Sequence, residues 1–171
     1  MTAEKVRILL DFFEQSMLIK VVKPFEHRIR NARECVKICL CDHAIRKARM
    51  KENIPLYGAT ANADMAGYII EGIVGTFFSS VKNLGVSYFP ADKNKSNEVD
   101  FILEIGDHHI PVEVKYSNNP NFGPGLKEFL NKAAYNAPFG LLITKDDIQT
   151  DFSADTKKII PISVKRLLLL K

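Results

Sequence analysis

This 171-residue sequence lacks the patterns of a membrane span, a secretion signal and a disulfide framework. No apolar run approaches the roughly 20 residues needed to cross a bilayer, and the opening MTAEKVR lacks the basic-then-apolar order of a secretion signal. We therefore expect a cytoplasmic protein without membrane contact. The cysteines Cys35, Cys39 and Cys41 are an odd number, which argues against a disulfide framework. Alternate residues on a strand fan out, so zinc binding with His43 is not favoured.

Nucleotide-binding and repeat signatures are also absent. No GxxxxGK[ST] phosphate-binding loop occurs, so the sequence does not support ATP use by this chain. There is no internal repeat and no low-complexity stretch. The length suits one ordinary domain, or a small module beside a compact domain.

Basic charge is concentrated near the N-terminus. Residues 20–51 hold 10 Lys or Arg against 3 Asp or Glu, whereas residues 52–171 hold 12 against 14. Such a basic stripe could meet a phosphate backbone, although an ordinary solvated face explains the charge equally well. The candidate nucleic-acid-binding residues are Arg28, Arg30, Arg33, Arg46, Lys47 and Arg49.

Composition and periodicity change near residues 52–66, where the segment NIPLYGATANADMAG holds Pro55, two glycines and small residues without a period, as in a linker or loop. Before this segment the pattern predicts a helix, two strands and a short basic helix, the content of part of a winged helix. We therefore expect a winged-helix-like basic segment at residues 1–55 and a second domain at 56–171. The second domain shows the order helix, strands, helix, strands, which predicts an α/β fold with an antiparallel hairpin.

The hairpin within residues 98–116 carries the most informative pattern. If Gly106-Asp107 is a two-residue turn, Asp100 lies opposite Glu113. Strict alternation then places the apolar residues of both strands on one core face and Asp100, Glu113 and Lys115 on the other. Like charges directly opposite destabilise a sheet, so the two carboxylates call for a cation.

Mg²⁺ suits this arrangement because it prefers one or two carboxylates plus waters and leaves positions for phosphate oxygens. The Lys115 ammonium could polarise an attacking water or stabilise charge on a phosphate. The alternative is that this is the solvated face of an amphipathic hairpin, with Lys115 paired to Glu98 across the strands.

Glu71 adds a further carboxylate. It lies inside the apolar helical run YIIEGIVGTFF, flanked by Gly67 and Gly75. Glycine inside a helix costs roughly 1 kcal/mol relative to alanine, so these glycines indicate close backbone approach or a site. The competing explanation is that Glu71 simply lies at the boundary between the polar and apolar faces of an amphipathic helix.

Four segments in this order, GYIIEGIVGTFF, EVDFIL, IPVEVKYS and GLLITKDD, resemble the PD-(D/E)XK nuclease superfamily. More narrowly, they resemble the C-terminal region of prokaryotic, often archaeal, predicted AAA+ ATPases, in which a winged-helix-like segment precedes the nuclease-like domain. ILLDFFEQSMLIKVVKPF and KICLCDHAIRKA look like that segment. The resemblance implies a restriction-endonuclease-like mixed sheet flanked by helices.

The same resemblance implies roles for four residues. Glu71, Asp100 and Glu113 would bind Mg²⁺ or Mn²⁺, and Lys115 would help position the attacking water. The expected function is endonucleolytic cleavage of DNA. A non-catalytic DNA-binding or protein-interaction module that keeps the nuclease fold is the alternative, and a purely structural domain is the third. Besides DNA, the partners considered are an ATPase module absent from this chain and a second copy.

Overall fold

Apolar and β-branched runs form strands, and segments with helical periodicity form the covering helices. The computed structural model describes residues 2–25, 35–50, 63–90 and 97–170. The strands are β1 (Ile19–Pro24), β2 (Lys37–Leu40), β3 (Gly85–Phe89), β4 (Val99–Ile105), β5 (His108–Lys115), β6 (Gly140–Thr144), β7 (Phe152–Ala154) and β8 (Lys157–Ser163). The helices are α1 (Ala3–Gln15), α2 (His43–Met50), α3 (Ala63–Ser80), α4 (Pro124–Asn131) and α5 (Val164–Leu169), with a 3-10 turn, η2 (Ala133–Tyr135).

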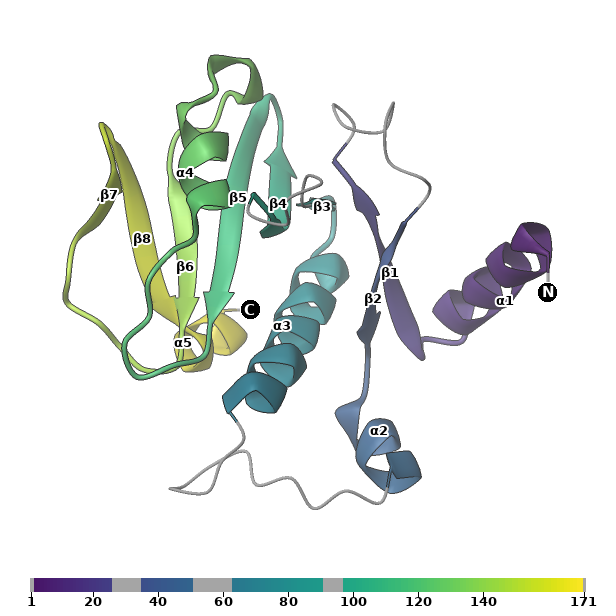
Figure 1. Ribbon diagram of the computed structural model, residues 1–171. Helices are drawn as coiled ribbons and strands as arrows, with labels where there is room; N and C mark the ends of the chain where they lie inside the picture. The colour runs from purple at the N-terminus through teal and green to yellow at the C-terminus, as the bar shows by residue number, and fades with distance from the viewer. Residues whose placement is uncertain (1, 26–34, 51–62, 91–96, 171) are drawn as a thin grey trace.

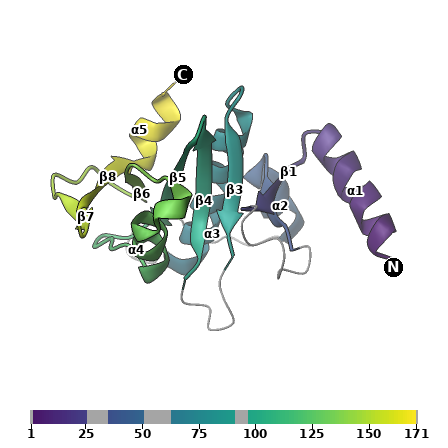
Figure 2. The ribbon, with the colours of Figure 1, turned by 90° about the horizontal axis from the view of Figure 1, so that it is seen from above.

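Within the described residues, the eight strands form one mixed sheet in the order β2-β1-β3-β4-β5-β6-β8-β7. Figure 2 shows this order across the molecule, from β7 at one edge towards β1 and α1 at the other. The pairs β1/β3, β5/β6 and β6/β8 are parallel and the remaining pairs are antiparallel. The fold is therefore mixed α/β, as predicted.

The β4/β5 hairpin has the predicted register. Its pairs run from Ile105 with His108 to Phe101 with Val112, which leaves Gly106 and Asp107 as the two-residue turn. Gly106 adopts a φ of 58°, a conformation that glycine reaches without steric cost.

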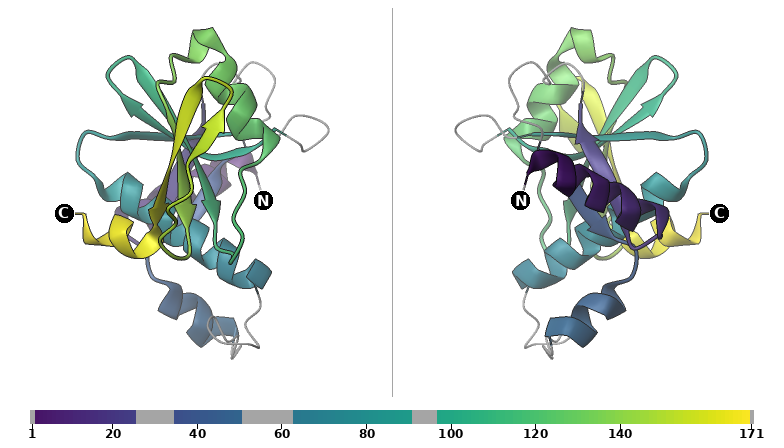
Figure 3. Two further views of the ribbon diagram at one scale, coloured as in Figure 1. Left: turned by 90° about the vertical axis from the view of Figure 1, so that its left-hand side faces the viewer. Right: turned by 90° about the vertical axis from the view of Figure 1, so that its right-hand side faces the viewer.

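Both faces of the sheet are buried. One apolar cluster lies under α3 and α5 and includes Phe101, Val112 and Val114, and the other lies under α4 and includes Ile102 and Leu142. Figures 1 and 3 show α3 and α4 on the two sides of the sheet. The alternative interpretation of the second hairpin face as solvated is therefore wrong, since β5 pairs in parallel with β6 at the sheet centre and such strands are covered on both sides.

A β-bulge breaks the alternation that the sequence pattern assumed. Ser87 pairs with Ile102 but Phe89 pairs with Val99, so Asp100 and Phe101 together oppose the single residue Tyr88. A bulge reverses the facing of the residues beyond it. Val99 accordingly packs in the cluster under α4. Regular alternation would have placed it on the same face as Phe101, which packs under α3. The same bulge directs Asp100 towards α3.

The N-terminal strands belong to the same sheet as the rest of the chain. β1 pairs in parallel with β3, and β2 extends the sheet from β1. The expected domain boundary at residue 55 falls outside the described residues. Helix α1 lies across the outside of β1 and contains no buried residue, so its apolar side chains such as Ile8 and Phe12 stay exposed (Figures 1 and 3).

Two helix glycines offer a matched test of packing. A Cβ on Gly75 would lie 2.5 Å from the Cys39 Sγ and 2.7 Å from the Phe101 Cζ, whereas a Cβ on Gly67 would meet nothing within 4 Å. We expect Gly75→Ala to lower the free energy of unfolding by about 1–3 kcal/mol through overpacking. Gly67→Ala is expected to raise it by up to about 1 kcal/mol, because alanine favours the helix. Urea unfolding of both variants measures this, and equal effects would contradict the close packing of α3 on β2 and β4.

Candidate active site

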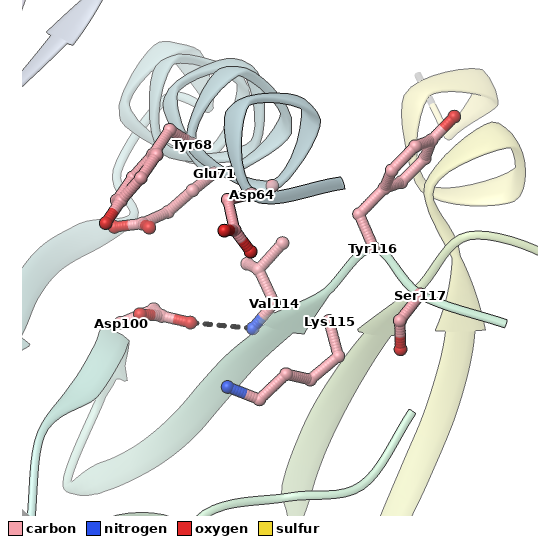
Figure 4. A pocket seen from close by; sticks show the side chains of 9 residues that line it. Asp64, Tyr68, Glu71, Asp100, Val114, Lys115, Tyr116 and Ser117 are labelled. Atoms are coloured by element: carbon pink, nitrogen blue, oxygen red, sulfur yellow. Dashed lines mark hydrogen bonds between the residues drawn. The ribbon is translucent and has the colours of Figure 1, made fainter. Parts of the chain in front are cut away.

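An open pocket of about 390 Å³ lies where α3 crosses the ends of β4 and β5. Figure 4 shows Asp64, Tyr68 and Glu71 reaching it from α3, Asp100 from β4, and Lys115 from β5. The full lining is Asp64, Gly67, Tyr68, Glu71, Asp100, Val114, Lys115, Tyr116 and Ser117. Three of the four predicted catalytic residues, Glu71, Asp100 and Lys115, therefore share one pocket.

The strands part at this point because of the Asp100 side chain. The β4/β5 backbone pairing ends at Phe101 and Val112, and beyond it the Asp100 Oδ2 accepts a hydrogen bond of 2.8 Å from the Val114 N–H. A carboxylate thus takes the place of a backbone carbonyl in the ladder, which satisfies the amide and keeps the carboxylate at the pocket. Figure 4 marks this bond with a dashed line.

Glu113 lies beside the pocket, on the α4 face of β5. Its backbone is in register with Leu142, which packs under α4, and its Oε1 lies 3.2 Å from the position that a Cβ would take on Gly123. The predicted placement of Asp100 and Glu113 on one face is therefore wrong, because the bulge turns Asp100 towards α3. The two carboxylates approach from the two sides of β5.

Lys115 forms an ion pair with Glu113. Its Nζ lies 2.8 Å from the Glu113 Oε1, and the Glu113 side chain is only 7% exposed. Burial disfavours the Lys115 ammonium, but the hydrogen bond and charge of Glu113 outweigh it and raise the pKa of Lys115. The alternative pairing of Lys115 with Glu98 does not occur, since Glu98 contacts Lys37 instead.

Lys37 on β2 is the site residue that the sequence pattern missed. Its Nζ lies 2.7 Å from the Glu71 Oε1, 3.5 Å from the Glu98 Oε1 and 3.8 Å from the Asp100 Oδ1. The available signal was weak: Lys37 is a lone charged residue inside the apolar run VKICLC. Its sequence distance from the hairpin gave no reason to connect it with these acids.

The charges around Asp100 are incompletely balanced. Burial and then the neighbouring Glu71 carboxylate raise the pKa of Asp100 to about 7, although Lys37 lowers it. Burial also disfavours the charged form of Lys37, but Asp100 and Glu71 outweigh this and raise the pKa of Lys37 above its usual value. The lysine is therefore protonated, and the acids still have capacity for further positive charge.

The donor set fits a hydrated Mg²⁺ or Mn²⁺ ion with few protein ligands. Among the described residues, no three Asp, Glu, His or Cys side chains form a preformed metal-binding group. The Glu113 Oε2 is nevertheless buried without a hydrogen-bond partner in the described part of the chain, and such an atom is costly unless a donor or cation approaches it. Mg²⁺ needs only one or two carboxylates, so Asp100 and Glu113 could hold it.

The predicted nucleic-acid-binding residues are mostly beyond what the structure describes. Arg28, Arg30 and Arg33 lie outside the described residues, as do the side chains of Lys47 and Arg49. The remaining residue, Arg46 on α2, places its Nη2 2.9 Å from the Sδ of Met65 at the start of α3. None of the helices in the described segments has the length and apolar character to pass through a membrane.

Fold and pocket together define a mixed α/β protein with a carboxylate and lysine site at the separated ends of two antiparallel strands. The chain belongs to the DUF4143 family, described as a domain of unknown function, whose model matches residues 66–164, more than half of the chain. The matched region includes Glu71, Asp100, Glu113 and Lys115 but not Lys37. No curated protein matched the sequence.

Proposed function

We propose that the protein is a divalent-metal-dependent phosphodiesterase that cleaves DNA, with a restriction-endonuclease-like core. One observation carries the proposal: the buried Glu113 pairs with Lys115 and keeps a second oxygen unpartnered, next to a pocket lined by Asp100 and Glu71. A buried acid of this kind stabilises no fold by itself, because an unpaired polar atom in a low-dielectric interior is costly. It is suited to binding a cation.

Four residues of the chain would have separate roles in this reaction. Asp100 and Glu113 would hold Mg²⁺ or Mn²⁺, which when bound supplies Lewis acidity and neutralises phosphate charge. The half-exposed Lys115 ammonium faces the pocket, where it would hold the attacking water and stabilise the developing negative charge on the phosphate. Glu71 orients Lys37 and adds negative potential on the α3 side.

The basic N-terminal third would bind the DNA backbone through the candidate arginines and Lys47, and such binding weakens steeply as salt is added. As part of the same proposal, the protein would act in the cytoplasm. An ATPase module on another chain, or a second copy of this chain, would be its protein partner.

A second candidate function is a DNA-binding or protein-interaction module that retains the nuclease fold without catalysis. Lys37 favours this candidate, because its ammonium already neutralises part of the charge on Glu71 and Asp100. A cation supplied by the protein reduces the need for a metal ion at these two carboxylates.

DNA cleavage distinguishes the two functions. Supercoiled plasmid, linear duplex, branched DNA and RNA are incubated with the protein and Mg²⁺, Mn²⁺ or EDTA. We expect metal-dependent cleavage of DNA that falls at least about 100-fold in Glu113→Gln. The control Asp155→Asn removes an acid from an exposed ion pair with Lys127 and should cut at the wild-type rate.

Two outcomes count against the proposal. Cleavage that survives Glu113→Gln would exclude this site. Absence of cleavage under all metal conditions, together with salt-sensitive DNA binding, would support the non-catalytic module.

A further inference from the structure

Lys37 is enclosed by three acids from two parts of the fold, α3 and the start of β4. Glu71 comes from α3, Asp100 from β4, and Glu98 from the residue just before β4. All three carboxylates have an oxygen within 4 Å of the one Nζ atom, at 2.7, 3.5 and 3.8 Å. The ammonium is therefore the common point on which these side chains converge.

The surroundings of the ammonium hold it firmly. It donates to the Glu71 Oε1 at 2.7 Å and to the Asp100 backbone carbonyl at 3.2 Å. It also lies 5.5 Å from the ring centre of Tyr88 and 5.1 Å from that of Phe101, within the range of cation–π attraction. An ammonium has three donors; these two hydrogen bonds use two of them, and the Glu98 and Asp100 carboxylates lie within 4 Å of the same nitrogen.

The surroundings of the Lys37 ammonium resemble those of a cation bound in a site, and they differ from those of an ion pair on the surface. Exposed pairs contribute little because solvent screens them, but the Lys37 side chain is only 16% exposed and faces three acids at once. Without a cation there, Glu71, Glu98 and Asp100 would repel one another across a partly buried space. With Lys37 in place, these three acids do not form a preformed metal-binding group in the described part of the chain. Carboxylates are nevertheless the ligand type that Mn²⁺ and Mg²⁺ take, so a variant without the ammonium would leave three such ligands facing one point.

We propose that Lys37 is a positioning residue that serves as the resident cation of Glu71, Glu98 and Asp100, at a point where a divalent ion would otherwise bind. Its effect on the site is to fix Asp100. With Lys37 near the Oδ1 and the Val114 amide on the Oδ2, both oxygens of that carboxylate are oriented. The role of Asp100 in chemistry rests on the proposed function, whereas the identity of the cation is a separate property.

Counting bound Mn²⁺ tests this inference. Wild type, Lys37→Met, Lys37→Met combined with Glu71→Gln, and Lys23→Met are titrated with Mn²⁺ alone, without DNA, and free Mn²⁺ is measured by electron paramagnetic resonance. Methionine keeps an unbranched apolar side chain and removes the charge together with its hydrogen-bond donors. Lys23→Met removes an exposed lysine from the adjacent strand β1.

We expect Lys37→Met to bind one more Mn²⁺ per chain than wild type or Lys23→Met. Adding Glu71→Gln should weaken that extra ion at least tenfold. An unchanged number of ions in Lys37→Met, or an extra ion that does not depend on Glu71, would overturn the inference.

Folding of the variant provides a second measurement. If Lys37→Met is unfolded without metal, Mn²⁺ should restore its circular dichroism spectrum, because binding to the folded state stabilises it. Failure of Mn²⁺ to restore the fold would overturn the inference as well. The test compares the number of Mn²⁺ ions bound by Lys37→Met and by wild type, and this difference does not depend on DNA cleavage. A wild-type protein that neither cuts DNA nor binds Mn²⁺ would refute the proposed function but not this inference.

Discussion

Replacing Lys115 by methionine is expected to reduce the rate of metal-dependent DNA cleavage by about 100- to 1,000-fold, the range found for loss of one preorganised charge-stabilising donor. The Lys115 ammonium lines the pocket, and its charge is secured by the buried Glu113 at 2.8 Å. Metal affinity should be retained or increased, because the variant frees the Glu113 Oε1. Single-turnover cleavage at saturating Mg²⁺, with Mn²⁺ binding measured by calorimetry, separates the two effects.

Lys127→Met is the matched control, since Lys127 forms an exposed ion pair with Asp155 on the side of α4. It should cleave at the wild-type rate. If Lys115→Met folds, binds Mn²⁺ and cuts DNA as fast as wild type, then Lys115 takes no part in catalysis.

Replacing Asp100 by asparagine is expected to stabilise the protein increasingly as pH rises. The pKa of Asp100 is raised from 3.8 to about 7, so between these values the folded chain keeps a proton that the unfolded chain releases. Wild-type stability therefore falls through this window and levels off above pH 7. Asparagine is neutral throughout and can still accept from the Val114 N–H through its amide oxygen.

The stability advantage of Asp100→Asn should grow by about 3 kcal/mol between about pH 5 and pH 8. Thermal unfolding in EDTA measures it as a melting-temperature difference that widens by several degrees. Asp155→Asn serves as the control: hydrogen bonds from Lys127 and Asn131 lower the pKa of Asp155, so its substitution should bring no gain at high pH. A difference between Asp100→Asn and wild type that is constant across pH would show that Asp100 ionises normally.

Local patterns in the sequence predicted much of the fold. The Gly106-Asp107 turn and the register of β4 with β5 were confirmed, because a two-residue turn between alternating strands leaves few other pairings. The helix carrying Glu71 was confirmed as α3 (Ala63–Ser80), and it starts inside the segment 52–66 where the composition of the sequence changes. The short strand β7 was not predicted, since three residues carry too little periodicity.

The geometry of the site depended on interactions that no local pattern contains. The bulge at Asp100 and Phe101 arises from pairing with β3, about a dozen residues earlier in the chain, so alternation within the hairpin did not reveal it. Lys37 reaches Asp100 only because β2 joins the sheet through β1 and lies under α3. The residue types of the site were predictable from the hairpin, but the side of the sheet on which each acid lies was not.

The position of Lys37 on an edge strand links the charge balance of the pocket to local opening of the sheet. β2 is held to its neighbour β1 by four paired residues, and edge elements of this kind detach more easily than central strands. Cys39 lies two residues after Lys37, with its thiol buried against Gly75 and its pKa raised by burial to about 11. Detachment of β2 would remove the lysine from the acids and expose this thiol in the same event, so the protein carries its own reporter for the open state of the pocket.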